Sequence, residues 1–270
     1  SFTDLTFGEW RSQYLTGFKK PAATNASLGT FRAPVGFAEA DSVDWVANGA
    51  VTPVKNQAQC GSCWAFSTTG ALEGASFIAG RPLTSLSEQN ILDCDKGGNK
   101  CQGGLMDQAF DWVKSNGICS EDSDPYKCAD QSSSECTSSM CPTSCTQVLK
   151  AGDVTGHTDV DQTEGALEAA VMKQPVSVAI EADQAVFQHY TKGVLSDAAC
   201  GQNLDHGVLA VGYGTDNGQK YWKVKNSWGT SFGEEGFIRI AKGAAAEGGE
   251  CGIRKAASFP TVKASTEIII

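Results

Sequence analysis

The pattern of hydrophobic and polar positions changes along the 270-residue chain. In the first part, apolar residues recur at helical spacing and predict helices over Ser62–Ile78 and Leu105–Gly117. A third helical pattern runs from Ala166 and ends before Pro175, and Leu5–Tyr14 carries a shorter one. The Ser62 hydroxyl is expected to cap the helix that it begins.

After Pro175 the period of the pattern becomes two. Alternation of apolar and polar residues predicts strands over Val176–Ile180, Trp222–Lys225 and Phe237–Ile240. Asp216-Asn217-Gly218 is typical of a hairpin turn. Helices followed by strands predict an α+β protein in two lobes, without a repeated βαβ unit.

Two stretches are predicted to lie outside helices and strands. Pro21–Gly36 is rich in Ala, Thr, Ser, Gly and Pro and is expected to be extended or linker-like. Gln131–Cys145 contains six Ser and three Cys in fifteen residues, too few apolar side chains for a core of its own. We therefore expect it to be a surface loop held by disulfides.

Acidic residues outnumber basic ones, 31 Asp and Glu against 21 Lys and Arg, so the formal net charge is −10. Nucleic acids and anionic membrane surfaces are bound by clustered Lys and Arg, so neither partner is expected. The longest apolar stretches, such as Val208–Val211, stay far below the roughly 20 residues that a bilayer requires.

Eleven cysteines are the strongest compositional signal. In an oxidising compartment they form disulfides, so a secretory route is expected, and Asn25-Ala26-Ser27 is then a glycosylation sequon. The N-terminus shows no signal-peptide pattern. Because eleven is an odd number, at least one thiol lies outside any set of internal pairs.

Cys63 is the candidate nucleophile. It falls in the first turn of a predicted helix, where unpaired N–H groups and the helix dipole favour a thiolate. Two alternatives remain open for Cys60-Gly61-Ser62-Cys63, a structural disulfide or a reversible redox pair. A disulfide-rich binding or storage protein is the non-enzymatic alternative.

Of the three histidines, His206 is the candidate base because it begins a strand that is otherwise apolar. His189 is expected on a solvated helical face and His157 in a turn. Asn226 follows a strand predicted to lie beside that of His206, so its amide can accept a hydrogen bond from the ring, which Trp228 would shield from water. A structural histidine and an asparagine at a strand end are the alternatives.

Cys60-Gly61-Ser62-Cys63-Trp64, with His206 143 residues and Asn226 163 residues after Cys63, resembles the papain/cathepsin pattern. The resemblance to cathepsin L-type cysteine proteases extends over nearly all of Val43–Pro260. Its further segments are Val43-Asp44-Trp45, Gly49–Gln57, Leu86-Ser87-Glu88-Gln89, Asp93-Cys94, Cys101-Gln102-Gly103-Gly104, Gln174–Val178 and Tyr221–Gly229. It implies a two-lobed papain-like fold of the α+β class, with a helical lobe, an antiparallel β-barrel-like lobe and the active-site cleft between them.

The resemblance also implies a division of the chain. Phe2-Thr3-Asp4 resembles the end of a pro-segment motif of the family, so residues 1–38 are expected to be the C-terminal remnant of an inhibitory pro-segment. We expect this remnant to lie along the cleft as a weak inhibitor, with the mature enzyme starting between Arg32 and Asp41. The other parts are the helical lobe with the nucleophile at 39–150, the β lobe with the histidine and asparagine at 151–262 and a tail at 263–270.

For the reaction, the resemblance implies a cysteine endopeptidase. Cys63 would be the nucleophile, His206 the general base and then the acid, and Asn226 the residue that orients His206. The Gln57 side chain and the N–H of Cys63 would form the oxyanion hole. Family members keep a thiolate–imidazolium pair and need no metal or organic cofactor. Cys94–Gly104 lacks the His-His insertion of carboxydipeptidases, which favours an endopeptidase.

The substrate site is carried over in the same way. Gly103 and Gly104 would hydrogen-bond an extended substrate, and Asp205 and Trp228 would border it. The pocket for P2, the second residue before the scissile bond, would be lined by Leu105, Met106, Ala179, Leu204, Gly207 and Ala256. All six are apolar or small, so Leu or Phe is expected at P2 rather than Arg. The implied partners are protein and peptide substrates, the pro-segment and cystatin-type inhibitors, and a monomer is expected in a lysosome or vacuole or outside the cell.

The resemblance also suggests part of the disulfide pattern. It pairs Cys60 with Cys101 and Cys200 with Cys251, and it leaves Cys63 free. Cys94 is expected to pair with a cysteine of the later loop, Cys136 or Cys145. Three further cysteines exceed the usual pattern and are not assigned, namely Cys119, Cys128 and Cys141.

Overall fold

The computed structural model describes residues 11, 14–15, 27–129, 136 and 140–265. Its helices are α2 (Cys63–Ile78), α3 (Glu88–Cys94), α4 (Met106–Asn116), α6 (Glu164–Lys173) and α7 (Ala185–Gln188). Three short 3₁₀ helices are η2 (Lys100–Gln102), η3 (Ala198–Cys200) and η4 (Glu250–Gly252). None of the helices in the described part of the chain combines the length and apolarity needed to cross a bilayer.

The strands form one large sheet and one small one. They are β1 (Ser27–Phe31), β2 (Val43–Asp44), β3 (Ile118–Cys119), β4 (Gln147–Leu149), β5 (Val154–Val160), β6 (Val176–Ile180), β7 (Val194–Leu195), β8 (His206–Asp216), β9 (Gln219–Lys225), β10 (Phe237–Ala241) and β11 (Ala257–Val262). The large sheet has nine strands in the order β1-β5-β11-β6-β8-β9-β10-β7, with β2 also paired to β8, while β3 pairs with β4. Most neighbours are antiparallel, but β1 with β5 and β7 with β10 run parallel.

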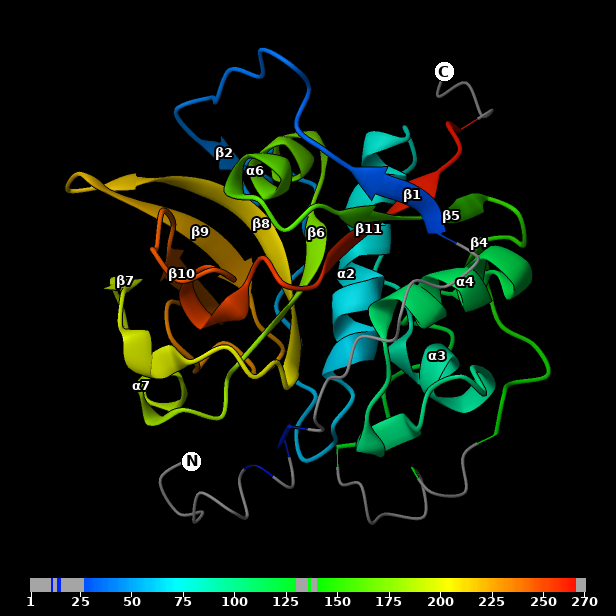
Figure 1. The fold of residues 1–270 in the computed structure, drawn as a ribbon. Helices are drawn as coiled ribbons and strands as arrows, with labels where there is room; N and C mark the ends of the chain where they lie inside the picture. The colour runs from blue at the N-terminus through cyan, green and yellow to red at the C-terminus, as the bar shows by residue number, and fades with distance from the viewer. Residues whose placement is uncertain (1–10, 12–13, 16–26, 130–135, 137–139, 266–270) are drawn as a thin grey trace.

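Strand β8 lies between two hydrophobic cores. Val208 and Ala210 face the core formed with β6, β9, β10 and α6, whereas Leu209 and Val211 face the core beneath α2, α3 and α4. Figure 1 shows α2 between these strands on one side and α3 and α4 on the other. The α+β class is therefore as predicted, and the division at residues 150 and 151 stays a prediction.

The N-terminus of α2 is held against the beginning of β8. The Ser67 hydroxyl donates to the carbonyl oxygen of Val208 at 2.8 Å, and the Ser177 hydroxyl donates to that of Ser67 at 3.0 Å. Gly70 permits the close approach, because a Cβ there would lie 2.8 Å from Leu209 Cδ2. The predicted helix is confirmed, but capping by the Ser62 hydroxyl is wrong: that hydroxyl makes no cap hydrogen bond.

Two segments differ from their predicted conformation. Within the predicted linker Pro21–Gly36, residues Ser27–Phe31 are extended as expected but form a strand of the sheet. His157 lies in β5 rather than in a turn, and its Nδ1 is 3.0 Å from Asp111 Oδ1. In both segments, pairing with distant strands overrides the local preference for turns.

All eleven cysteines are described; ten form disulfides and Cys63 is a free thiol. The Cys60–Cys101 and Cys200–Cys251 pairs are confirmed, which excludes the redox pair of Cys60 with Cys63. The predicted partners of Cys94 are wrong, because Cys94 pairs with Cys141. Spacing does not determine which Cβ atoms meet. The remaining pairs are Cys119–Cys145 and Cys128–Cys136.

Other predictions fall wholly or mainly outside the described residues. The structure describes only Arg11 and Tyr14 of the predicted helix Leu5–Tyr14, and both are helical. The sequon at Asn25 and the motif Phe2-Thr3-Asp4 lie outside. Of the predicted surface loop Gln131–Cys145, the structure describes Cys136 and residues 140–145, and its three cysteines are all in disulfides.

Candidate active site

Cys63 is the first residue of α2, and its side chain is buried. The backbone N–H of Gly207 donates to its Sγ atom at 3.3 Å, so the thiol touches the residue that follows His206. Burial raises the pKa of Cys63 to about 11, and the hydrogen bond from Gly207 only partly opposes this. In the structure the thiol is therefore protonated at neutral pH.

His206 begins β8 and is fully buried. Its Nε2 atom lies 2.8 Å from Oδ1 of Asn226, and because an amide oxygen can only accept, Nε2 carries the proton. Its Nδ1 atom is buried and has no hydrogen-bond partner among the described residues. Burial lowers the pKa of His206 to about 4, so the ring is neutral, with a lone pair on Nδ1.

Asn226 and Trp228 hold the imidazole in place. Asn226 follows β9 directly, and its Oδ1 also accepts from the backbone N–H of Ser227 at 2.8 Å. The Trp228 ring stacks on that of His206 with centroids 4.7 Å apart, and edge-on contacts with Phe187 and Phe232 fix the indole. The predicted orientation and shielding of His206 are thus present as geometry.

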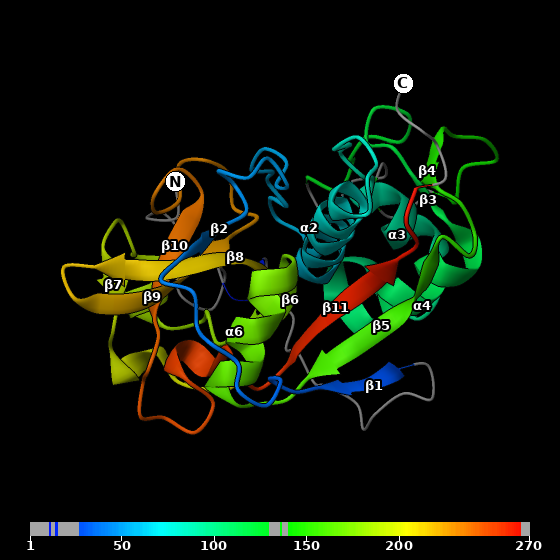
Figure 2. The same ribbon diagram turned by 90° about the horizontal axis from the view of Figure 1, so that it is seen from above.

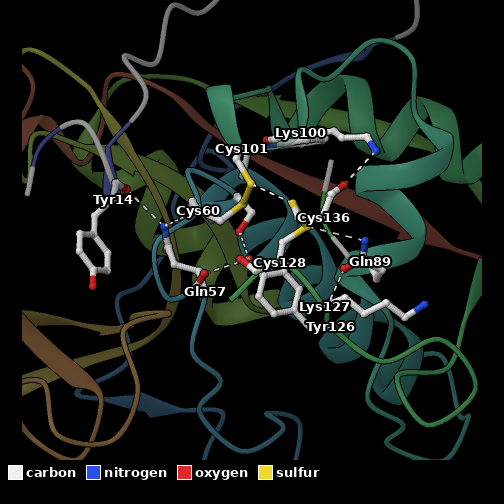
Figure 3. Close-up of a disulfide and its surroundings, with 12 residues drawn as sticks. Tyr14, Gln57, Cys60, Gln89, Lys100, Cys101, Tyr126, Lys127, Cys128 and Cys136 are labelled. Carbon is white, nitrogen blue, oxygen red and sulfur yellow. Dashed lines mark hydrogen bonds between the residues drawn. A yellow bond between two sulfur atoms is a disulfide. The ribbon is translucent and has the colours of Figure 1, made fainter. Parts of the chain in front are cut away.

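Gln57 is fully buried beside these groups, and both ends of its amide are engaged. Nε2 donates to the carbonyl oxygen of Cys60 at 2.8 Å and to that of Tyr14 at 3.2 Å. Oε1 accepts from the Ser227 hydroxyl at 2.5 Å. Figure 3 shows Gln57 between Tyr14 and the Tyr126 ring, with the Cys60–Cys101 disulfide beside it.

Tyr126 and Ser227 support the site but were not assigned a role from the sequence. The Tyr126 hydroxyl donates to the Gln57 carbonyl oxygen at 2.9 Å, and it lies 2.8 Å from Ser62 Oγ. Nothing in the neighbours of Tyr126 signals this contact, which joins segments 69 residues apart. Ser227 lies inside the motif with Asn226, so its position alone could have suggested it.

Residues of the N-terminal segment lie over the candidate site. The Tyr14 ring contacts Trp228 edge-on with centroids 6.4 Å apart, and Leu15 is buried in the adjoining core. Arg11 Nε lies 3.4 Å from Asp183 Oδ2. The described part of this segment therefore covers Gln57 and Trp228.

Four residues predicted for the P2 pocket meet in one apolar cluster. Met106, Ala179 and Ala256 are buried there, and Leu204 packs against them. A Cβ on Gly207 would lie 3.3 Å from Met106 Sδ, so this glycine adjoins the same cluster. Leu105 is partly buried at the N-cap of α4, outside that cluster.

The remaining substrate-site candidates have distinct environments. Gly103 and Gly104 are partly exposed, and a Cβ on Gly104 would lie 2.4 Å from Trp64 Cδ2, so a side chain is excluded there. Asp205 is buried and accepts from the Ala182 N–H at 2.8 Å. Burial, with Asp183 and Glu181 nearby, raises the pKa of Asp205 to about 7.

The other polar clusters do not compete as candidate sites. His189 is exposed at the end of α7, as predicted. Four sulfur atoms lie within 4.8 Å of one another, but all four are in disulfides and so are not thiolate ligands for a metal. They belong to Cys60, Cys101, Cys128 and Cys136.

Residues 39–261 match the family described as papain family cysteine protease. The chain belongs to this family. It is 47% identical over 265 residues to the probable cysteine protease RD21B of Arabidopsis thaliana. That similarity covers 97% of this chain and 55% of the relative, so the chain spans little more than half of the relative's length.

Solved structures of the papain family show the same fold. Bromelain from Ananas comosus in complex with the E64 inhibitor has a TM-score of 0.75 and 41% identity, covering 83% of this chain and all of that one. The digestive procathepsin L 3 of the Tenebrio molitor larval midgut has a TM-score of 0.81 and 40% identity. It covers 97% of this chain, and 81% of its own length is matched. The papain-like fold implied by the sequence is confirmed.

Proposed function

We propose that the chain is a cysteine endopeptidase that hydrolyses peptide bonds in proteins. The observation that carries the proposal is the meeting of α2 with β8: the Cys63 thiol contacts the Gly207 N–H, while Asn226 orients the preceding His206. A nucleophile, a base and a residue that orients the base are the parts that acyl transfer requires.

In the proposed reaction, His206 Nδ1 takes the proton of the Cys63 thiol, and Sγ attacks the carbonyl carbon of the scissile bond. The oxygen becomes negative and accepts hydrogen bonds from Gln57 Nε2 and the Cys63 N–H. The C–N bond then breaks, and the leaving amine takes the proton from His206. Water, deprotonated by His206, hydrolyses the resulting thioester and releases the acid and the free thiol.

The N-terminal segment is proposed to inhibit this reaction. The Tyr14 carbonyl oxygen accepts from Gln57 Nε2, where a substrate oxyanion would otherwise bind. Burial also keeps Cys63 and His206 neutral, so the thiolate–imidazolium pair requires a hydrated, open cleft. Departure of the segment would supply both conditions.

Substrate preference is proposed to follow the apolar cluster of Met106, Ala179 and Ala256. These short or flexible apolar side chains carry no charge to pair with an arginine, so Leu or Phe at P2 is expected to give the highest kcat/KM. A library of peptide substrates that varies only P2 tests this. Arg ranking first would contradict it.

The central test is labelling with a peptide-based epoxide that reacts with thiols, near pH 5, followed by mass mapping. Stoichiometric labelling at Cys63, with loss of hydrolysis of a protein substrate, is the expected result. The Cys63→Ala protein is the matched control and should neither react nor hydrolyse. Hydrolysis that persists after complete labelling would contradict the assignment, and neither labelling nor hydrolysis would favour a binding or storage protein.

The compartment is proposed to be oxidising and reached by the secretory route, as a lysosome, a vacuole or the extracellular space. Five disulfides support this, because the cytosol keeps such thiols reduced. Fractionation of the source cells with an antibody to the chain tests it. Recovery in the cytosolic fraction alone would contradict the proposal.

A further inference from the structure

Strand β1 is the outermost strand of the sheet and contacts it through β5 alone. Figure 2 shows β1 alongside β5, with β11 on the other side of β5. The pairing is parallel, with Thr30 opposite Asp159 and Phe31 opposite Val160. The Asp161 N–H donates to the Phe31 carbonyl oxygen at 2.9 Å, which extends the pairing past the end of both strands.

Phe31 is seated by residues from three elements. Its ring meets that of Phe259 on β11 edge-on, with centroids 5.6 Å apart. The Lys173 ammonium, from the end of α6, lies 5.0 Å from the centre of the same ring. Val160 of β5 is its strand neighbour and belongs to the same core. An aromatic side chain in such a pocket is a typical anchor of a peptide ligand.

A second position is shaped by Gly156. A Cβ there would lie 3.0 Å from Cγ of Leu28, so the missing side chain leaves room for this leucine. Polar contacts frame the two anchors: the Ser27 hydroxyl donates to Asp159 Oδ2 at 2.9 Å, and Arg32 Nε lies 3.3 Å from Asp161 Oδ2. Side-chain seats beside a strand edge are how added strands are recognised.

We propose that the edge of β5 is a peptide-binding exosite whose ligand is the chain's own segment 27–32, held as an added strand even when the chain is cut. The site lies apart from the catalytic groups, since β11 and β6 separate β5 from β8 in the sheet. Its ligand is an extended peptide with Leu, Phe and Arg at the positions of Leu28, Phe31 and Arg32. Binding there does not require that Cys63 be catalytic.

The consequence concerns the turn that follows β1. Val35 is fully exposed there, next to Pro34, whose carbonyl oxygen accepts from the Phe37 N–H at 2.9 Å. A cut in this turn leaves all the contacts of segment 27–32 intact, so the exosite retains the N-terminal segment. Retention keeps Tyr14, which precedes the exosite ligand in the same segment, at a high local concentration near Gln57.

The test uses the full chain with Cys63→Ala, so that no step depends on proteolysis by the chain itself. Recognition sites for two different site-specific proteases are placed within residues 16–26 and at the exposed turn 34–36. Cutting at both yields a fragment that carries β1 but neither Tyr14 nor Leu15. Gel filtration with mass detection measures how fast this fragment leaves the protein.

We expect the fragment with the native β1 sequence to co-elute with the remainder of the chain. Phe31→Ala should accelerate its release at least about tenfold, because the anchor is lost. Thr30→Ala, at the exposed neighbouring position, is the matched control and should not. All three proteins have the same remainder after cutting, so misfolding cannot mimic the result. Release of the native fragment as fast as that of Phe31→Ala, or equal acceleration by Thr30→Ala, overturns the proposal.

A double-mutant cycle tests the seat at Gly156. Its φ of +150° strains an alanine whether or not β1 is bound, so Gly156→Ala alone is ambiguous. The cycle compares Gly156→Ala in chains with Leu28 and with Leu28→Ala. Release should be accelerated more where Leu28 is present, and equal acceleration in both backgrounds overturns the assignment of Leu28 to the exosite.

Discussion

The side-chain amide of Gln57 donates a hydrogen bond of 3.2 Å to the main-chain carbonyl oxygen of Tyr14. A peptide carbonyl of the N-terminal segment thus takes the donor proposed for the substrate oxyanion. Leu15, the next residue, is buried in the core next to the site and is the apolar anchor of this contact. Inhibition and substrate binding would therefore compete for the same amide.

Leu15→Ala is expected to increase the rate at which an epoxide or iodoacetamide labels Cys63, by roughly 3- to 10-fold. The smaller side chain loses buried contact, so the segment leaves the cleft more often and the thiol regains water. Val35→Ala changes an exposed residue of the same segment and should leave the rate unchanged. Equal rates for both variants and the parent chain would show that Leu15 does not hold the segment over the cleft.

Asn226→Ala is expected to lower kcat by about 10- to 100-fold with a much smaller effect on KM. The ring N–H of His206 would lose its partner in a dry site, and the imidazole would no longer be held with Nδ1 free. Kinetics with a fluorogenic peptide measure both constants after removal of the N-terminal segment. Asn217→Ala, in an exposed turn, is the control, and a change confined to KM would contradict the proposed role.

Much of the site could be predicted from the sequence because its residues stand at the ends of regular elements. Cys63 begins a helix, His206 begins a strand and Asn226 ends one, and the apolar periods locate those ends. Strands joined by a tight hairpin must lie side by side, so His206 and Asn226 were expected to be neighbours. The long loop closures were then settled by the likeness to a family.

The covering segment and the extra disulfides could not be predicted in this way. Ser27–Phe31 has two large apolar residues, and its partner His157 lies 130 residues later, so no local pattern reveals the pairing. His157 was misplaced for the same reason. The partner of Cys94 depends on where the loop to Cys141 runs, which spacing along the chain does not specify.

Tyr126→Phe is expected to lower kcat by about 3- to 10-fold and the free energy of unfolding by about 1 kcal/mol. The lost hydroxyl bonds the Gln57 carbonyl oxygen and Ser62 Oγ, so the oxyanion-hole amide would be less firmly placed. Steady-state kinetics and urea unfolding measure the two effects. Tyr221→Phe, on a partly exposed strand face, is the matched control. An unchanged kcat together with lower stability would make the role of Tyr126 structural only.

Cys141→Ser is expected to leave Cys94 as a second free thiol beside Cys63. The structure bonds these two cysteines, whereas the family pattern suggested other partners for Cys94. Differential alkylation under denaturing conditions and peptide mapping identify the exposed thiol. Cys145→Ser is the comparison and should free Cys119 instead. Labelling of Cys94 in the Cys145→Ser protein would contradict the pairing.

Asp205→Asn is expected to stabilise the fold at neutral pH more than at acid pH. Burial raises the pKa of Asp205 to about 7 from an ordinary value of 3.8, so its favourable contribution is complete below pH 3.8 and is lost as the pH rises through 7. Above that range the folded protein holds an ionised buried carboxylate, which Asn removes while keeping an acceptor for the Ala182 N–H. Urea unfolding of Cys63→Ala proteins should show a gain that grows by about 1–3 kcal/mol between pH 4 and pH 8. Asp122→Asn, at an exposed position, controls for the change in net charge. A gain that is the same at every pH would mean that Asp205 does not titrate in this window.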